Sequence, residues 1–253
     1  MNRATFSLCL ACCIAGVALL APSAAQRKTP SSSPNTLTEE EKKEGWKLLF
    51  DGLTMKGWRG AYLDSLPERG WRVRDGMLTV ESSGGGEAAF GGDIVTMDEY
   101  GSFELKVDFR LTEGANSGIK YFVIEGMPRT PGSAKGLEYQ ILDDARHPDA
   151  KLGIRGNRTL ASLYDLIPAS NKHVKPIGEW NSASIIVRGR HVEHWLNGIK
   201  VLEYERGGTE FLAHKAESKF KDIPGFGEAD RGHILLQDHG NEVHFRNIKI
   251  RTF

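Results

Sequence analysis

Apolar and charged residues alternate without a break over residues 103–110, and this period of two constrains the fold more than any other feature of the sequence. Successive side chains of an extended chain point to opposite faces, so such a run buries one face and exposes the other. The apolar members are Phe103, Leu105, Val107 and Phe109, and the charged members are Glu104, Lys106, Asp108 and Arg110. Residues 102–110 are therefore predicted to form a half-buried strand.

Similar short runs recur along the rest of the chain. They cover residues 71–73, 77–80, 119–124, 137–142, 184–187, 192–196, 199–204, 234–237 and 243–250. Asn197-Gly198 lies between two of them and is a strong hairpin signal, because both residues tolerate the positive φ of a type I′ turn. No long amphipathic helix is evident. The pattern predicts an all-β fold, a jelly-roll β-sandwich of two antiparallel sheets with one polar face per strand.

The first 25 residues have the three parts of a secretory signal peptide. Arg3 precedes an apolar run over residues 8–21, and Ser23-Ala24-Ala25 supplies the small residues of a cleavage site. All three cysteines, Cys9, Cys12 and Cys13, lie inside the run, so cleavage after Ala25 would leave a chain without cysteine. We expect export to the periplasm or the cell exterior; anchoring as a lipoprotein through Cys12 or Cys13 is the alternative.

Residues 26–44 are predicted to be a disordered linker with one short helix. Residues 27–38 are rich in Ser, Pro and Thr, whereas Thr38 and Glu41 have the spacing of a capping box. Residues 45–253 contain no second linker of this kind and are predicted to be one domain. After residue 21 no apolar stretch approaches the roughly 20 residues that a membrane span requires.

Charge excludes several classes of partner. The chain has 33 Lys and Arg against 33 Asp and Glu, so it lacks the basic excess typical of proteins that bind nucleic acid. The sequence also has no GxSxG elbow, phosphate-binding loop, dinucleotide-binding GxGxxG or HExxH zinc motif. A partner is therefore expected to be recognised by shape and polar groups.

Residues 138–144 are the most informative segment for chemistry. On a regular strand Glu138 and Gln140 share one face, and Asp143 joins them only if a bulge resets the alternation near Leu142. In the structural alternative Glu138 and Gln140 lie on a solvated face and Asp143-Asp144 begins a loop. Asp143 and Asp144 are also weak candidates for a divalent cation, because carboxylates bind hard cations but their spacing is not that of a calcium loop.

Other polar groups also follow predicted strands. They are Asn116, Lys120, Tyr164, Glu179, Trp180, Gln237 and His239. Sugar recognition uses this mixture, because amides and carboxylates bind hydroxyl groups while an aromatic face covers the C–H side of the ring. Each has a structural alternative: a core position for Trp180, a turn for Asn116 and a solvated charge for Glu179. The long segments 144–160 and 207–232 lack the strand pattern and are expected to wall a cleft.

Phrases spread over the predicted domain resemble the 3-keto-disaccharide hydrolase domain family. They are Leu49-Phe50-Asp51-Gly52, Gly57-Trp58, Trp71-Arg72-Val73-Arg74-Asp75-Gly76, Tyr100-Gly101-Ser102-Phe103-Glu104-Leu105, Gly114-Ala115-Asn116-Ser117-Gly118-Ile119, Glu138-Tyr139-Gln140-Ile141-Leu142-Asp143, Gly178-Glu179-Trp180-Asn181, Leu196-Asn197-Gly198, Gln237-Asp238-His239-Gly240 and Phe245-Arg246-Asn247-Ile248. The family often has Arg shortly after the Ser-Gly-Ile phrase, where this chain has Lys120. The resemblance implies a concanavalin-like jelly roll and a carbohydrate substrate.

The resemblance also implies cleavage of glycosides that carry a ketone at C3. A C3 ketone acidifies the C2 hydrogen, so a base can remove it, the C1 substituent can leave and water can then add. The implied roles are Glu138 or His239 as base and Asp143 or Glu179 as acid. Gln140, Lys120 or a bound divalent cation would stabilise the enolate.

Two other functions fit the same residues. Glu138, Gln140 and Asp143 are similar in spacing to the Glu-x-Asp-x-x-Glu strand of concanavalin-like retaining glycosidases, although a shorter acid alters the carboxylate separation of roughly 5–5.5 Å that double displacement needs. A carbohydrate-binding module without turnover is the other alternative, because one fold serves both purposes.

Overall fold

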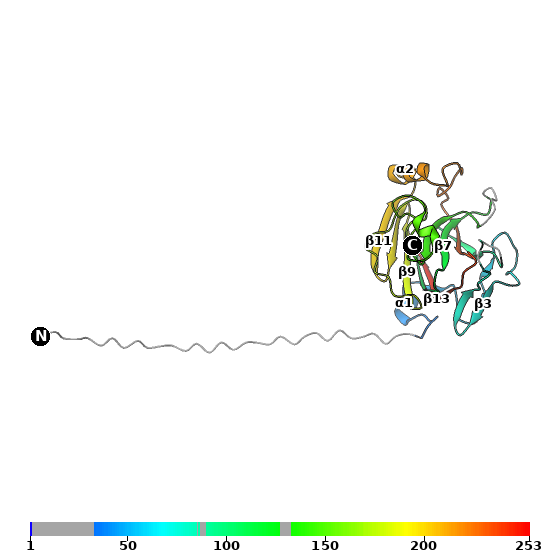
Figure 1. Cartoon of the computed structure of the whole chain (residues 1–253). Helices are drawn as coiled ribbons and strands as arrows, with labels where there is room; N and C mark the ends of the chain where they lie inside the picture. The colour runs from blue at the N-terminus through cyan, green and yellow to red at the C-terminus, as the bar shows by residue number, and fades with distance from the viewer. Residues whose placement is uncertain (2–32, 85, 87–89, 127–132) are drawn as a thin grey trace. The chain divides into compact units, whose positions relative to one another are not determined.

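The computed structural model describes residue 1 and residues 33–253 except 85, 87–89 and 127–132. The predicted signal peptide therefore lies outside the described residues, as does the first part of the linker. The described residues from 33 to 253 belong to one compact unit (Figure 1). Among the described residues, no helix is both long and apolar enough to cross a membrane.

Two sheets make up the body, and every strand pair in them is antiparallel. The larger has the order β11-β10-β9-β6-β13-β4-β3, with β1 paired to β13, and the smaller has the order β2-β5-β12-β7-β8. The larger sheet comprises β1 Lys47–Leu48, β3 Trp71–Arg74, β4 Met77–Val80, β6 Phe103–Leu111, β9 Asn181–Arg188, β10 His191–Leu196, β11 Ile199–Glu205 and β13 Val243–Thr252. The smaller comprises β2 Trp58–Gly60, β5 Ile94–Tyr100, β7 Asn116–Val123, β8 Leu137–Leu142 and β12 Gly232–Leu236. The predicted sandwich of two antiparallel sheets is confirmed.

The alternation in β6 fixes which side of the larger sheet faces the core. Its apolar residues are at most 1% exposed from Phe103 to Phe109, and the side chains between them are mostly half-buried. Glu104 is the exception at 7% exposure, because Arg251 donates to its carboxylate from Nε at 2.9 Å. The hairpin at Asn197-Gly198 is also confirmed, with φ values of 51° and 79° that match a type I′ turn.

Several elements were not predicted from the sequence. β5 lacks simple alternation, because three consecutive exposed residues separate its buried ends. β2 is short, and the predicted loop 207–232 contains a helix, α2 Thr209–Glu217, which buries only Phe211. Figure 1 shows α2 at one end of the sandwich.

The predicted short helix is α1, Glu39–Lys43, and both bonds of its capping box are present. Glu41 also pairs with Lys249 of β13, and Arg251 donates to Glu44 at 3.0 Å. The packed body begins before residue 45, since Asn35 is 7% exposed and accepts from the Asn247 backbone nitrogen at 2.8 Å. Part of the predicted disordered linker is therefore fixed against β13.

The strands β7, β8 and β12 are buried on both faces. The prediction of one solvated face per strand is wrong for them. Their inner faces pack in the core. Residues 161–167 lie along the edge of β8, where the Tyr164 backbone nitrogen donates to the Glu138 backbone oxygen at 3.0 Å. The polar side chains of this sheet are consequently held in a covered environment.

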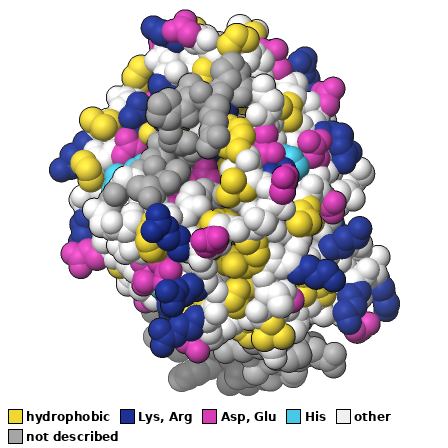
Figure 2. All heavy atoms as spheres, turned by 90° about the vertical axis from the view of Figure 1, so that its right-hand side faces the viewer, with side chains coloured by type: hydrophobic (Ala, Val, Ile, Leu, Met, Phe, Trp, Pro, Cys, Tyr) yellow, Lys and Arg dark blue, Asp and Glu magenta, His cyan; other side chains and the backbone are white. Residues whose placement is uncertain are grey.

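On the surface of the protein, Figure 2 shows acidic and basic side chains interspersed over the face in view, as a net charge of zero suggests.

A polar cluster lies in the core between the sheets. Tyr121 is 2.8 Å from His194 Nε2 and 2.6 Å from the Tyr204 hydroxyl, and His194 Nδ1 is 2.9 Å from the Ala161 carbonyl. Because the Ala161 oxygen only accepts, Nδ1 carries the proton and Nε2 accepts from Tyr121. Burial lowers the pKa of His194 to about 4, so the imidazole is neutral in the folded protein.

This pKa predicts how stability depends on pH. Between the unfolded pKa of about 6.5 and the folded pKa of about 4, the unfolded chain binds more protons, so the free energy of unfolding falls as pH falls. From pH 7.5 to 5.0 the expected loss from this group is about 2 kcal/mol. Urea titrations of His194→Gln should show a smaller loss over this range. His191→Gln is the control. Glu205 raises the pKa of His191, so removing this imidazole should not reduce the loss of stability between pH 7.5 and 5.0. An unchanged pH dependence in His194→Gln would contradict the assignment.

Candidate active site

A cavity of about 380 Å³ opens over the smaller sheet, at strands β7, β8 and β12. Seven of the residues singled out from the sequence line it: Asn116, Lys120, Glu138, Gln140, Tyr164, Gln237 and His239. The remaining lining residues are Ala134, Lys135, Gly136, Lys219, Phe220 and Ile223. Residues from five separate segments of the chain therefore meet in one polar cavity of the size that small ligands occupy.

Glu138 lies at the centre of the polar wall. It is on β8, is 6% exposed, and its Oε2 is 3.7 Å from Lys120 Nζ on the neighbouring strand. The Gln140 amide is 3.0 Å from Glu138 Oε1 and 3.1 Å from the Ser117 carbonyl, and since both are acceptors, the amide nitrogen faces them and donates to both. The solvated-face alternative for Glu138 and Gln140 is therefore wrong.

Gly118 allows the Glu138 side chain to lie flat against β7. A Cβ at position 118 would overlap Glu138 Oε1 and would also lie 2.9 Å from its carboxyl carbon. Gly118 pairs with Gln140 in the ladder between β7 and β8, so the strand cannot move aside alone. The glycine therefore leaves the space that the Glu138 carboxylate occupies, and a larger residue would displace this side chain.

Tyr164 reaches the cavity from a segment that β8 holds in place. The Ala161 nitrogen donates to the Gln140 oxygen at 2.8 Å, and the Tyr164 nitrogen donates to the Glu138 oxygen. Burial raises the pKa of the Tyr164 phenol, and the nearby Glu138 and Asp149 carboxylates raise it further. The phenol therefore stays protonated at neutral pH and can donate a hydrogen bond beside Glu138.

Behind Lys120 lies a buried chain of polar groups that the sequence patterns did not reveal. Lys120 Nζ donates to Ser133 Oγ and to the Ala134 carbonyl, the latter at 3.2 Å, and Ser133 donates to Asp93. Asp93 also accepts from the Asp238 nitrogen at 2.9 Å. Asp93 and Ser133 lie outside any strand pattern, so only their tertiary contacts identify them.

Asp238 is completely buried and organises the loop that carries His239. Its carboxylate accepts from the backbone nitrogens of Gly91, Gly92 and Gly240, each at 3.0 Å. His239 is half-buried, and its ring lies edge-on to His147 with 5.8 Å between centroids. Burial lowers the pKa of His147, and the neighbouring His239 lowers it further.

The two long segments contribute differently to the cavity. The segment after α2 supplies Lys219, Phe220 and Ile223 to the lining, and Phe220 stacks on Phe226 at 4.1 Å. Lys219 Nζ lies 4.4 Å from the centre of the Tyr164 ring. Residues 144–160 do not line the cavity. From this segment the His147 ring lies edge-on to His239, and the Asp149 carboxylate contributes to the raised pKa of Tyr164.

Asp143 and Asp144 are not brought to this cavity. The register between β7 and β8 is continuous up to Leu142, so no bulge turns Asp143 toward Glu138. Asp143 accepts from the Gly114 nitrogen at 2.9 Å, and Asp144 accepts from Lys172 Nζ at 2.6 Å. Both carboxylates are thus occupied by donors that hold loops, which leaves them poorly suited to a cation.

Glu179 and Trp180 also lie elsewhere. They precede β9, which belongs to the larger sheet, whereas the cavity is on the smaller one. The Trp180 ring is covered by the guanidinium groups of Arg246 and Arg110, at 4.0 and 5.0 Å from its centre. Glu179 is exposed in the preceding loop.

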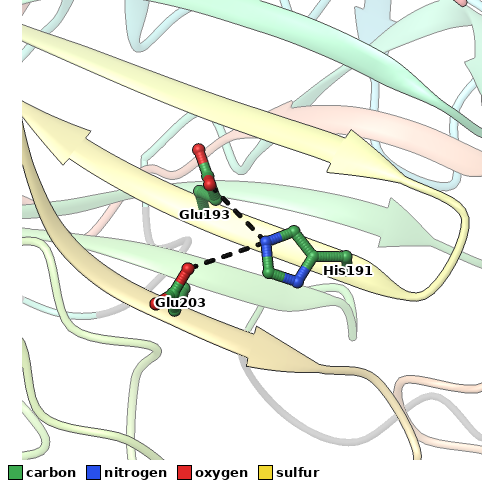
Figure 3. A group of neighbouring side chains, drawn as sticks. All are labelled: His191, Glu193 and Glu203. Carbon is green, nitrogen blue, oxygen red and sulfur yellow. Dashed lines mark ion pairs between the residues drawn. The ribbon is translucent and has the colours of Figure 1, made fainter.

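One group among the described residues could supply three metal ligands from closely spaced atoms. His191, Glu193 and Glu203 lie on β10 and β11 of the larger sheet (Figure 3). Lys200 already pairs with both carboxylates, at 3.4 Å from Glu193 and 2.6 Å from Glu203. The cluster is better explained as a surface ion-pair network, and it is not part of the cavity.

Comparisons with known proteins show which family the chain belongs to. The model of the 3-keto-alpha-glucoside-1,2-lyase-like domain matches residues 45–251. A 3-keto-disaccharide hydrolase of Bacteroides thetaiotaomicron is 39% identical over 229 residues, which cover 83% of this chain and 79% of that protein.

This chain belongs to the 3-keto-alpha-glucoside-1,2-lyase-like family. Solved structures from Parabacteroides distasonis support the membership. A candidate glycosyl hydrolase is 34% identical with a TM-score of 0.76, covering 87% of this chain and all of that one. A second is 28% identical with a TM-score of 0.60, covering 82% of this chain and 99% of the other. The protein is therefore an enzyme of the glycoside hydrolase and lyase class.

The role of Asp238 in holding the loop that carries His239 can be tested by measuring the free energy of unfolding. In Asp238→Asn the amide NH₂ must face at least one backbone N–H that the carboxylate now accepts, which leaves a buried donor without a partner. We expect the free energy of unfolding to fall by about 2–3 kcal/mol in urea titrations. Asp98→Asn, at an exposed position of β5, should stay within about 0.5 kcal/mol of the parent. Equal losses in the two variants would contradict this role.

Proposed function

We propose that this protein cleaves glycosides already oxidised to a ketone at C3 of the sugar, by elimination across C1–C2 followed by addition of water. The observation that carries the proposal is the convergence of Glu138, Lys120, Tyr164 and His239 in one cavity. The name of the Bacteroides relative, a 3-keto-disaccharide hydrolase, supports the same substrate class.

Glu138 is the proposed base. The C3 ketone makes the C2 hydrogen acidic, and the carboxylate takes it as a proton while the bonding electrons move into the enolate. Lys120 lies 3.7 Å from one carboxylate oxygen and the Gln140 amide lies 3.0 Å from the other, and together they fix the position of the carboxylate. Its burial limits hydration, so the base need not shed ordered water before it reacts.

The enolate oxygen needs donors on the same wall of the cavity. Lys120 supplies a positive charge, and the amides of Asn116 and Gln237 line the same space. Fixed donors in a partly closed cavity stabilise developing negative charge better than water does, because they need no reorganisation. The enolate then collapses, expels the oxygen substituent from C1 and leaves a C1=C2 double bond conjugated with the ketone.

Tyr164 or His239 is the proposed acid for the departing oxygen. Asp143 and Glu179 are outside the cavity, whereas Tyr164 and His239 line it. Tyr164 keeps its proton at neutral pH for the reasons given above. The oxygen of a water molecule then adds to C1, and C2 regains a proton. The overall result is hydrolysis of the glycosidic bond. Ordinary double displacement is disfavoured because Glu138 and Asp143 do not share the cavity.

The test is to incubate the protein with a glucoside and with its 3-keto derivative, each with and without EDTA, while following released aglycone and enone absorbance. Turnover of the keto form alone supports the proposal, and loss with EDTA would add a cation to it. Cleavage of the unoxidised glucoside would instead favour a retaining mechanism. Binding of keto-glycosides without any product would make the protein a carbohydrate-binding module.

Replacement of the base gives a sharper prediction. Glu138→Gln keeps the shape of the side chain but cannot accept the C2 proton, so kcat should fall by about 10³-fold while binding changes little. Steady-state kinetics and calorimetric titration with a slowly cleaved keto-glycoside separate the two effects. Glu40→Gln, on the exposed face of α1, is the control and should match the parent. Retained turnover in Glu138→Gln would remove Glu138 from the mechanism.

We also propose that the protein is exported, on the sequence of residues 1–25. When the full chain is produced in a Gram-negative host, the fraction released by osmotic shock should begin at Gln26. A membrane-bound form acylated at Cys12 or Cys13 would indicate a lipoprotein instead. An uncut chain that begins at Met1 and stays inside the cell would contradict export.

A further inference from the structure

The chain of polar groups behind the cavity connects two buried carboxylates through one ammonium group. Asp93, Ser133, Lys120 and Glu138 are 4%, 3%, 5% and 6% exposed. Lys120 Nζ lies 3.7 Å from Glu138 Oε2 and donates to the Ser133 hydroxyl and the Ala134 carbonyl. The line therefore runs Glu138, Lys120, Ser133, Asp93, from the cavity into the protein.

The direction of the hydrogen bonds along this line is determined by the chemistry of its ends. An ammonium group can only donate and an ionised carboxylate can only accept. The Ser133 hydroxyl must therefore accept from Lys120 and donate to Asp93, as its contacts show. No other orientation of that proton satisfies both neighbours.

Asp93 is itself held in place. Its carboxylate accepts from the Ala134 nitrogen at 3.3 Å and from the Asp238 nitrogen at 2.9 Å, so it is tied both to the segment that carries Ser133 and to the segment that carries His239. A buried ammonium is costly unless it is paired and fully hydrogen-bonded. Lys120 is paired with the Glu138 carboxylate at 3.7 Å and donates hydrogen bonds to the Ser133 hydroxyl and the Ala134 carbonyl.

We propose that Asp93 and Ser133 are positioning residues, which aim the Lys120 ammonium at Glu138 and so hold the base where it meets the substrate. Neither residue lines the cavity, so neither touches the substrate. The proposal rests on the proposed function, because it assigns these residues to the base of that reaction. Without Ser133, Lys120 keeps its charge but loses the contact that orients it.

The experiment compares Ser133→Ala with Ser133→Thr in the full-length protein. Thr keeps the hydroxyl, and Ala removes it. For Ser133→Ala we expect kcat on a 3-keto-glucoside to fall about 10- to 100-fold with little change in KM, the range typical when a supporting partner of a reactive group is lost. Ser133→Thr should recover most of the loss, and Asp93→Asn should behave like Ser133→Ala. Ser184→Ala on β9 of the larger sheet is the control and should leave both constants unchanged.

A second readout does not depend on turnover. Acetylation of lysines by a water-soluble active ester, followed by mass spectrometry, measures how freely each amine reacts. Relative to exposed Lys56, Lys120 should be protected in the parent and in Ser133→Thr, and several-fold more reactive in Ser133→Ala and Asp93→Asn. Unfolding titrations of each variant show whether the fold itself is intact.

The outcomes separate the two proposals. A parent protein that cleaves no keto-glycoside contradicts the proposed function, and the acetylation pattern then decides the positioning role alone. If Ser133→Ala has the same kinetic constants and the same acetylation of Lys120 as the parent, the positioning role is overturned. A kcat loss that Ser133→Thr does not restore, in folded variants, overturns it as well, because the hydroxyl would then not be the group that matters.

Discussion

The buried ion pair between Lys120 and Glu138 is the constraint on which the rest of the site depends. Two opposite charges at 3.7 Å, each almost fully buried, are stable only if nearby groups satisfy their other hydrogen bonds. Ser133, Ala134 and Gln140 supply those bonds, and Gly118 leaves the space that the carboxylate needs. The pairing of β7 with β8 places the two charged residues opposite each other.

The same ladder ties the cavity to the core. Residues 161–164 bond to the edge of β8, and the Ala161 carbonyl is also held by the neutral imidazole of His194 between the sheets. The segment that carries Tyr164 is therefore held by the edge of β8 and by a side chain in the core. Asp238 fixes the turn that carries His239. The groups proposed for acid and base chemistry are thus mounted on a rigid sheet, while Lys219 and Phe220 come from a longer connection.

The sequence alone determined the architecture because alternation is a local property. Strands such as β4, Met77–Val80, and β8, Leu137–Leu142, have the predicted bounds, and the hairpin at Asn197-Gly198 follows from the backbone preferences of two residues. The polar residues on and just after the predicted strands are local features too, and they made Glu138, Gln140 and His239 candidates before the family phrases added roles to them. Charge balance, likewise, needed no structure.

Only the tertiary structure decided which candidates meet. Glu138 and Asp143 are five residues apart and alternate faces, so the continuous register of β8 separates them. Glu179 and Trp180 belong to a segment that enters the other sheet. Asp93 and Ser133 are far apart in the sequence, and no local pattern marks either of them. Only the folded structure shows that Ser133 bonds both to Asp93 and to Lys120, the partner of Glu138. Contacts between distant segments depend on sheet order, which alternation does not encode.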